Sequence, residues 1–377
     1  MAAGQIPTMP QAPRLLFIAP LPPPNGGVAH ISEMIIKSTL AEEYDIVLIN
    51  ASKPNEIRER VGRIGITSFS HPLVLWVRLA VQLVRFRPGI VYVVCSSDYS
   101  YLRAALFMLT ARVARAKVVA HFHGRRRGFL FGGRFRITDL ILRGTVPLFD
   151  KMIFLSPGLQ QSLVNAFGTE KSEVVRNFVD MRLMPLPRLE ERRGNQIVFV
   201  GRLSRAKGMV ELIEAMALLV KDGVPAFLHL IGIGETQDEE ETIRSMVHAK
   251  GLDGMVHFHG TLMGFEKGEL MARSDIFVLP SRSEIFPVTI VEAFAAALPV
   301  VSTTTGAIPE MVLEGSNGFL VDPGDAHALS QRLRLLLENK ELRTAIAQRN
   351  LLLARTTYTK ESAIAHITKI LQSVGAA

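Results

Sequence analysis

Short apolar runs along the chain alternate with stretches of helical periodicity. Most runs, such as 90–95 (IVYVVC) and 196–200 (QIVFV), are continuous in Val, Ile, Leu and Phe. Uninterrupted runs of this length are typical of strands in a parallel sheet that is covered on both faces. Between the runs, as in 208–221, apolar side chains recur at helical spacing. This alternation of strands and helices predicts an α/β fold.

The runs fall into two sets, which predict two domains. Strands are expected at 14–19, 45–49, 90–95, 117–122 and 151–155 in the first set, and at 196–200, 226–231, 255–259, 275–279, 299–302 and 318–321 in the second. Between the sets, 181–195 carries prolines and a mixed-charge cluster, which is typical of an exposed linker. The expected organisation is a flexible tail (1–13), a first domain (14–180), the linker (181–195), a second domain (196–357) and a C-terminal helix (358–377).

Charge distinguishes the two halves of the 377-residue chain, whose net charge is +8. Residues 1–180 hold 22 Lys and Arg against 12 Asp and Glu, a net +10, whereas 181–377 hold 21 against 23, a net −2. A basic first half suits an anionic surface or substrate, although a solvated basic face would give the same count.

Cysteine content and hydropathy bear on the compartment. Cys95 is the single cysteine, which excludes an internal disulfide. The apolar runs are all shorter than the roughly 20 residues that span a bilayer, and 1–13 lacks the basic and apolar regions of a signal peptide. These observations predict a cytoplasmic location.

The turn after 196–200 carries two cations that suit a phosphate. Ligands of open parallel sheets bind at the carboxyl ends of the strands. Arg202 and Lys207 bracket this turn, while Arg205 between them is expected to face solvent. A guanidinium forks onto phosphate oxygens and an ammonium adds a point charge, so the pair could neutralise a diphosphate. An ordinary basic loop is the alternative.

Two carboxylates, Glu284 and Glu292, follow the run 275–279 and stand eight residues apart. A helix is expected to begin near Val288, which places Glu292 about one turn inside it. Both carboxylates can then face one crevice, with the free N–H groups of the helix start between them. A carboxylate there suits bidentate hydrogen bonds to a ribose diol, whereas the structural alternative is that both merely complement the helix dipole.

Glycine turns after other strands are weaker signals. Gly26 and Gly27 precede an expected helix and would let a ligand approach the backbone. Gly232 and Gly234 could admit a base or ribose edge, and Thr261 follows the next strand in a similar position. None of these turns forms the G-x-G-x-x-G fingerprint of a dinucleotide site.

The run 117–122 continues into His121-Phe122-His123, which puts both histidines on one face of a strand. His123 is nearer the carboxyl end, where a neutral imidazole could orient or polarise a sugar hydroxyl. A satisfied structural histidine is the alternative, and it is favoured for His121.

Arginine and aromatic residues interleave in the segment that follows, beginning with Arg125, Arg126 and Arg127. This mixture suits an anionic lipid surface or a lipid-linked diphosphate, and single-stranded nucleic acid would use the same ingredients. The stretches 76–87 and 102–117 are predicted to be basic amphipathic helices, either membrane-facing or packed on the core with solvated arginines.

Several motifs in combination resemble the group 1 (family 4) retaining glycosyltransferases. The pattern G-R-L-x-x-x-K-G stands at 201–208 and E-x7-E at 284–292. The segment that begins at Glu292 matches E-A-x-A-x-G-x-P-V-V, with Ala297 in place of the glycine. Segments 177–180 and 317–321 also resemble family landmarks. The resemblance spans about 14–370 and is looser in the first half.

The resemblance implies the GT-B fold, in which two Rossmann-like parallel-sheet domains face each other across a cleft. It implies that Arg202 and Lys207 bind the donor diphosphate, that Glu292 binds the ribose and that Glu284 lies near the donor sugar. His123 would lie near the reacting centre. Gly26 and Gly27 would line the cleft, and the C-terminal helix would return to the first domain.

One loop departs from the family pattern. Where E-G-F-G is usual, this chain has Glu284-Ile285-Phe286-Pro287, and Pro287 has no N–H to offer a ligand. The amides of Phe286, Val288 and Thr289 remain as candidates for contacts with the sugar donor. The identity of the donor sugar is therefore left open by this loop.

The resulting hypothesis is a retaining, metal-independent glycosyltransferase without a cofactor. It would move a hexose from a UDP- or GDP-linked donor to a glycan acceptor, expected to be lipid-linked, at the inner face of the cell membrane. The family needs no metal because cations and helix dipoles stabilise the leaving diphosphate. Alternatives are a nucleotide-sugar epimerase of similar fold and a non-catalytic membrane-associated protein. A dehydrogenase and a nucleic-acid binder are disfavoured.

Overall fold

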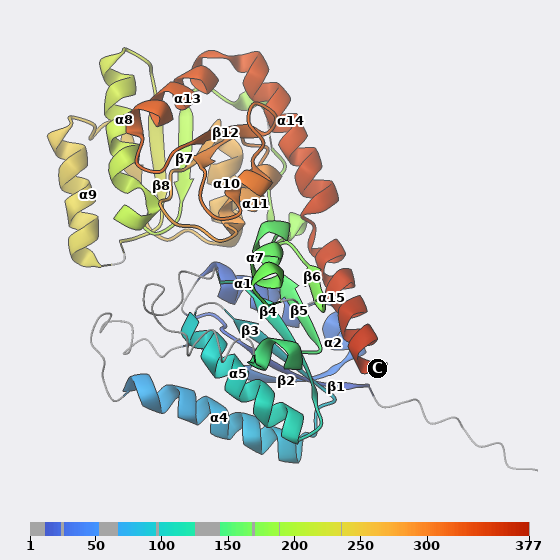
Figure 1. Ribbon diagram of the computed structural model, residues 1–377. Coiled ribbons are helices and arrows are strands. Elements are labelled where there is room, and N and C mark those ends of the chain that lie inside the picture. The colour runs from blue at the N-terminus through green and yellow to red at the C-terminus, as the bar shows by residue number, and fades with distance from the viewer. Residues whose placement is uncertain are drawn as a thin grey trace, which may run out of the picture. The chain divides into compact units, whose positions relative to one another are not determined.

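The computed structural model describes residues 12–23, 26–52, 67–95, 98–124, 144–167, 170–187, 189–234 and 236–376. The chain divides into two compact units (Figure 1). The first comprises Met1–Val175 together with Ile364–Ala377, and the second comprises Arg176–Ala363. Each unit contains one six-stranded sheet in which all strand pairs are parallel.

The first unit is an open sheet whose strands run in the order β2-β1-β3-β4-β5-β6. Its described elements are β1 (Arg14–Ala19), α1 (Gly27–Ile36), α2 (Leu40–Glu43), β2 (Asp45–Asn50), α4 (Thr67–Arg85), β3 (Ile90–Cys95), α5 (Asp98–Val113), β4 (Lys117–Phe122), the 3-10 turn η1 (Val146–Leu148), β5 (Lys151–Phe154), α7 (Pro157–Phe167) and β6 (Ser172–Val174), and most of α15 (Lys360–Gly375) belongs here too.

The second unit has the strand order β12-β11-β10-β7-β8-β9. Its elements are η2 (Met181–Leu183), η3 (Leu189–Glu191), β7 (Gln196–Val200), η4 (Arg205–Lys207), α8 (Met209–Lys221), β8 (Phe227–Ile231), α9 (Gln237–Ala249), β9 (Val256–Phe258), α10 (Gly264–Arg273), β10 (Ile276–Leu279), α11 (Val288–Ala295), β11 (Val300–Thr303), α12 (Ile308–Met311), β12 (Gly318–Val321), α13 (Ala326–Glu338) and α14 (Lys340–Thr357).

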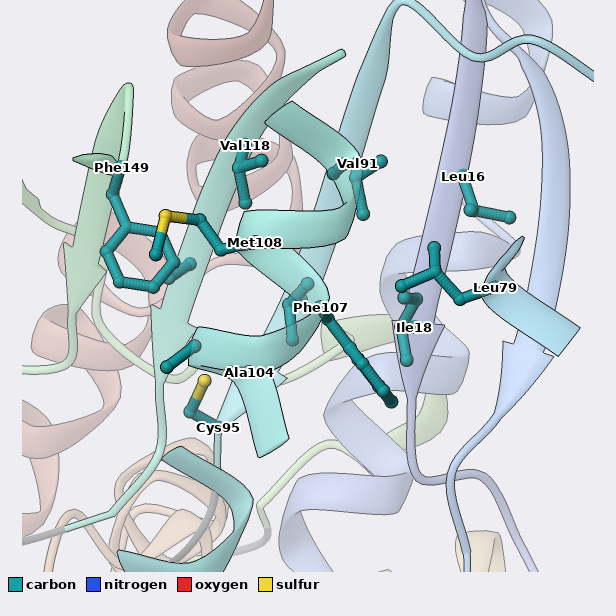
Figure 2. Packing of buried hydrophobic residues seen from close by; sticks show 14 of the residues in the cluster. Leu16, Ile18, Leu79, Val91, Cys95, Ala104, Phe107, Met108, Val118 and Phe149 are labelled. Atoms are coloured by element: carbon teal, nitrogen blue, oxygen red, sulfur yellow. The ribbon is translucent and has the colours of Figure 1, made fainter. Parts of the chain in front are cut away.

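Burial explains why the strands read as unbroken apolar runs. Every residue of β3 is buried, since helices cover both faces of the sheet. Figure 2 shows Phe107 and Met108 of α5 and Leu79 of α4 among residues of the sheet such as Val91. These helices therefore use one apolar stripe each to build the core of the first unit.

Strand order determines where each sheet can bind a ligand. In the second unit β7 is the first strand, β8 and β9 extend the sheet on one side, and β10 to β12 extend it on the other. This is the Rossmann order, in which the first three strands extend the sheet to one side and the fourth begins its extension to the other side. The loops after β7 and β10 begin at this point, which is where sheets of this order bind their ligands. In the first unit the corresponding point lies between β1 and β3.

The predicted α/β fold is confirmed, and the predicted strands match the observed ones to within one or two residues. Short β6 was missed because Ser172–Val174 contains one apolar residue and is only half-buried. The division between the units falls at Val175–Arg176, and the whole of 181–195 belongs to the second unit. Arg192 is not exposed as a linker residue would be, since it donates to the carbonyl oxygens of Ala296 and Ala297.

Candidate active site

Two loops meet at the carboxyl ends of the neighbouring strands β7 and β10. The amide of Arg282 in the second loop donates to the carbonyl of Ala206 in the first, at 3.0 Å. Gly208 has a left-handed backbone, with φ at 77°, and a Cβ there would lie 2.0 Å from the carbonyl oxygen of Pro280. Only glycine allows the two loops to approach so closely. These contacts hold together residues that are more than 70 positions apart in the sequence.

Lys207 and Glu284 form an ion pair across these loops. Lys207 Nζ lies 2.5 Å from Glu284 Oε1, and the Ser281 hydroxyl donates to the same oxygen at 2.8 Å. Glu284 is buried and Lys207 is half-buried. An ammonium has three N–H donors, so Lys207 can hold Glu284 and still offer donors to an anion. The structure thus brings together two of the residues singled out from the sequence.

Glu292 lies on α11 and is paired with Lys267 of α10. Lys267 Nζ is 2.7 Å from Glu292 Oε1, and both side chains are largely buried. The second carboxylate oxygen, Glu292 Oε2, is buried and has no hydrogen-bond partner in the described part of the chain. A buried carboxylate oxygen without a partner is costly, so this atom is a candidate acceptor for hydrogen bonds from a ligand.

The first turn of α11 lies between the two carboxylates. Pro287 is its N-cap and provides no side-chain cap. The N–H groups of Val288 and Thr289 begin the helix and have no intrahelical acceptor. Phe286 is buried, and its carbonyl oxygen accepts from Asn177 Nδ2 at 3.0 Å. The side chain of Phe286 is thus part of the packing, while the helix start remains an anion-attracting feature.

The other residues proposed for the sugar donor lie around these loops. Arg202 follows β7 and its side chain is exposed. Gly232 holds the loops after β7 and β8 together, because a Cβ there would lie 1.9 Å from the Gly201 carbonyl oxygen. The Gly234 amide already donates to Glu240 Oε2, at 3.0 Å. Thr261 is exposed beyond β9.

At the carboxyl end of β4 in the first unit, His121 and His123 lie side by side, with ring centroids 4.1 Å apart. The Tyr92 hydroxyl lies 2.7 Å from His121 Nδ1. His121 Nε2 and both ring nitrogens of His123 are buried without a partner among the described residues. Burial lowers the pKa of His123 to about 3 and also lowers that of His121, so both rings are neutral near pH 7.

The remaining residues of the predicted site are only partly described. Gly26 is the N-cap of α1 and Gly27 is its first residue. A Cβ at Gly26 would meet nothing within 4 Å, so the space in front of α1 is open. Arg125, Arg126 and Arg127 lie outside the described residues. Within the described part of the chain, no cluster of three or more His, Cys, Asp or Glu side chains is arranged to hold a metal ion.

Sequence reasoning missed Lys267. Its partner Glu292 is twenty-five residues away, so spacing alone does not connect them. One signal was present, since Lys267 shares the buried face of α10 with Met271, one turn further on. A lysine on the apolar face of an amphipathic helix requires a partner, because a buried charge is costly without one.

Two Rossmann-like parallel-sheet domains define the GT-B class. This chain has both sheets, and the second one carries the turn with two cations and the two carboxylates. Solved structures agree on the fold. HepE of Anabaena superimposes with a TM-score of 0.74 at 21% identity, over 96% of this chain and 100% of that one. Sucrose-phosphate synthase of Thermosynechococcus elongatus has a TM-score of 0.78 at 15% identity, over 97% of this chain and 99% of that one.

Two family descriptions match the sequence. "Glycosyltransferase Family 4" matches residues 25–183 and "Glycosyl transferases group 1" matches residues 187–351. Together they cover most of both units, and the chain belongs to the group 1 glycosyltransferases of the family 4 type.

Individual relatives match over shorter stretches. The putative colanic acid biosynthesis glycosyltransferase WcaL of Escherichia coli is 36% identical over 171 residues, which is 44% of this chain and 41% of WcaL. The phosphatidyl-myo-inositol mannosyltransferase of Mycobacterium leprae is 30% identical over 247 residues, or 63% of either chain. The match thus covers less than half the length of WcaL.

Proposed function

We propose that this protein transfers a hexose from a nucleotide diphosphate sugar to a glycan acceptor, with retention of the anomeric configuration. The observation that carries the proposal is the pair of ammonium–carboxylate contacts flanking the first turn of α11. Lys207 and Glu284 lie on the loops that follow β7 and β10, the two strands at the switch point of a Rossmann-ordered sheet. Glu292, paired with Lys267, lies on the helix that follows β10. Anionic nucleotides bind to such sheets at the switch point.

Each group in the site has a part that suits its chemistry. Lys207 and Arg202 bind the diphosphate, together with the first amides of α11. Glu292 accepts hydrogen bonds from the two ribose hydroxyls, and its unpartnered Oε2 supports this role. Glu284, held by Lys207 and Ser281, accepts from the hydroxyls of the donor sugar.

In the proposed transfer the bond between the anomeric carbon and the diphosphate oxygen breaks while the acceptor oxygen bonds to the same face of that carbon. The acceptor proton passes to the leaving phosphate. Lys207 and the start of α11 stabilise the negative charge that develops on the diphosphate, so the protein supplies positive charge without a metal ion. The neutral imidazole of His123 is proposed to orient a sugar hydroxyl.

The acceptor is proposed to be a glycan intermediate on a lipid carrier, met at the inner face of the cell membrane. Two observations support this proposal. The first half of the chain has a net charge of +10. WcaL, which is similar over 171 residues, is described as a putative glycosyltransferase of colanic acid biosynthesis. No helix among the described residues is long and apolar enough to cross a bilayer.

Calorimetric titration with UDP, GDP, ADP and CDP tests the sugar-donor site directly, without an acceptor. We expect one of them, UDP or GDP, to bind with one site per chain. HepE was solved with UDP, which makes UDP the first choice. Lack of binding by all four nucleotides would contradict the proposal. NMR of the product anomeric proton then distinguishes retention from inversion, and formation of an epimerised sugar without acceptor would favour an epimerase.

A further inference from the structure

Helix α4 is apolar on two faces, of which the sheet covers only one. Leu75, Leu79 and Leu83 are buried against the sheet. Leu73, Val74, Val77, Val81 and Val84 lie on another face and are exposed, Val84 by 72%. Since a water-facing helix surface normally carries polar residues, an uncovered second apolar face is unusual in a soluble domain.

Helix α5, which packs beside α4, extends this surface. Its buried residues Phe107, Met108 and Ala111 contact the core, whereas Leu106, Leu109 and Val113 are exposed, Val113 by 87%. Trp76 Nε1 of α4 donates to Thr110 Oγ1 of α5 at 3.0 Å, so the two helices are in direct contact.

On a helical wheel, Leu73, Val77 and Val84 are the exposed apolar residues of α4 nearest to this contact, and Leu106, Leu109 and Val113 of α5 flank it, so the two stripes adjoin. Figure 1 shows α4 and α5 side by side. Together they form one apolar surface, here called the α4–α5 face.

The charges around the α4–α5 face are almost all positive. Between 67 and 117 the chain has seven Lys and Arg and a single acid, Asp98 at the start of α5. Arg78, Arg85, Arg87 and Arg115 are exposed and form no ion pair with a carboxylate of the described residues. The rim of the apolar face therefore has an unneutralised positive charge.

Two of these arginines occupy unfavourable backbone positions. Arg87 and Arg115 follow the last turns of α4 and α5 with φ of 50° and 60°. Glycine is the usual residue in this left-handed conformation, because it has no Cβ to clash. The chain thus keeps a cation at the same end of both helices at a cost in stability, and such strain is often retained for function.

We infer that the α4–α5 face docks on an anionic lipid bilayer, with both helices lying in the plane of the membrane surface. The apolar side chains enter the acyl boundary and the arginines meet the lipid phosphates. A second copy of the chain fits less well, since it would bring the same arginines together without acids to neutralise them. The inference names the surface for the membrane location given under the proposed function, and it rests on that part of the proposal. The sugar-donor site belongs to the second unit, so nucleotide binding and sugar transfer can hold even if this inference fails.

Flotation with vesicles tests the inference on the full chain. The chain should bind vesicles containing phosphatidylglycerol, weakly bind those of phosphatidylcholine alone, and release as salt is raised. The combined substitution Val77→Gln, Val81→Gln and Val84→Gln should weaken binding about a hundredfold, because three side chains no longer bury apolar area. These side chains are exposed, so the fold should persist. Leu352→Gln on α14, also exposed (62%), is the matched control and should leave binding unchanged.

The charged rim is tested separately. Arg78→Gln with Arg85→Gln should weaken binding to the anionic vesicles about tenfold and abolish the preference for them, whereas Arg355→Gln on α14 should not. Arg115→Gly should raise the midpoint of thermal unfolding and still weaken vesicle binding, since it relieves the left-handed backbone but removes a cation.

Three outcomes would overturn the inference. The first is no vesicle binding by the unaltered chain, and the second is full binding by the triple valine variant. The third is a concentration-dependent dimer, measured by light scattering, which the triple variant abolishes, because the face would then belong to a second copy. Nucleotide titration of the same variants should give unaltered affinity, which separates this test from that of the sugar-donor site.

Discussion

At the carboxyl edge of the second sheet, two ammonium groups hold two carboxylates. At the corresponding edge of the first sheet, two neutral imidazoles lie buried with three ring nitrogens unpartnered among the described residues. The two edges come from the same strand–turn–helix design but carry different chemistry. Paired charges can rearrange around an anionic ligand at little desolvation cost, since they are compensated before and after binding. Neutral, unpartnered imidazoles suit an uncharged ligand with hydroxyl groups.

The outward surfaces of the units differ as well. In the second unit many exposed arginines have carboxylate partners, such as Arg334 with Asp222 and Arg244 with Glu240. On the α4–α5 face of the first unit, Arg78, Arg85, Arg87 and Arg115 have none among the described residues, and exposed apolar side chains lie near them. Arg112 is the exception, since it pairs with Asp150. The same fold therefore supports a self-neutralised surface in one unit and an unneutralised one in the other.

The largest expected effect is on nucleotide affinity, from a substitution at the carboxyl edge of the second sheet. Lys207→Ala should weaken nucleotide diphosphate binding about a hundredfold, roughly 2.7 kcal/mol, because a charge-assisted contact is lost and Glu284 faces the diphosphate without its ammonium. Calorimetric titration measures the affinity. Lys221→Ala, an exposed lysine at the end of α8, is the control. Equal affinity in both variants would remove Lys207 from the site.

A smaller effect is expected from the partner of Glu292. Lys267→Met keeps the length of the side chain but leaves Glu292 Oε1 without its donor, so the carboxylate is less firmly positioned for the ribose. Nucleotide affinity should fall about tenfold, roughly 1.4 kcal/mol.

The companion measurement uses nucleotides that lack ribose hydroxyls. The unaltered chain should bind 2′-deoxynucleotide more weakly than the ribonucleotide, and Lys267→Met should reduce that difference. If Lys267→Met lowers both affinities by the same factor, Lys267 does not act through the ribose contact.

The smallest expected effect concerns the buried histidines at the carboxyl edge of the first sheet and the pH dependence of the free energy of unfolding. The pKa of His123 is about 3 in the folded chain and about 6.5 when unfolded, so above pH 6.5 neither state binds the proton. Between pH 6.5 and 3 only the unfolded state is protonated, and the free energy of unfolding therefore falls as the pH falls. His121, with a lowered pKa, acts in the same direction.

The substitution His123→Gln removes one of the two imidazoles that bind a proton in the unfolded state but not in the folded state. The loss of unfolding free energy between pH 6.5 and 5.5 should shrink by about 1 kcal/mol, measured by urea unfolding at each pH. Tyr92→Phe, which deletes the contact with His121 but no imidazole, should keep the full slope. A His123→Gln slope equal to that of the unaltered chain would show that His123 is not held neutral by burial.

Much of the fold was predictable from the sequence, because its signals are local. Continuous apolar runs such as 90–95 are typical of strands covered on both faces, and the structure places β3 there. The turns after β7 and β10 were identified by residue types within a dozen positions, and Lys207 and Glu284 do meet. β6 escaped because its side chains lack the apolar signal.

What the sequence determined by itself was the order of strands and helices, the residues of each turn and the imbalance of charge between the halves. Only the tertiary structure decided that Lys267 reaches Glu292, and that α4 and α5 keep a second apolar stripe uncovered. An apolar residue reads the same in sequence whether it faces the core or water. Which one it faces depends on what packs against it, and that is decided by elements far away along the chain.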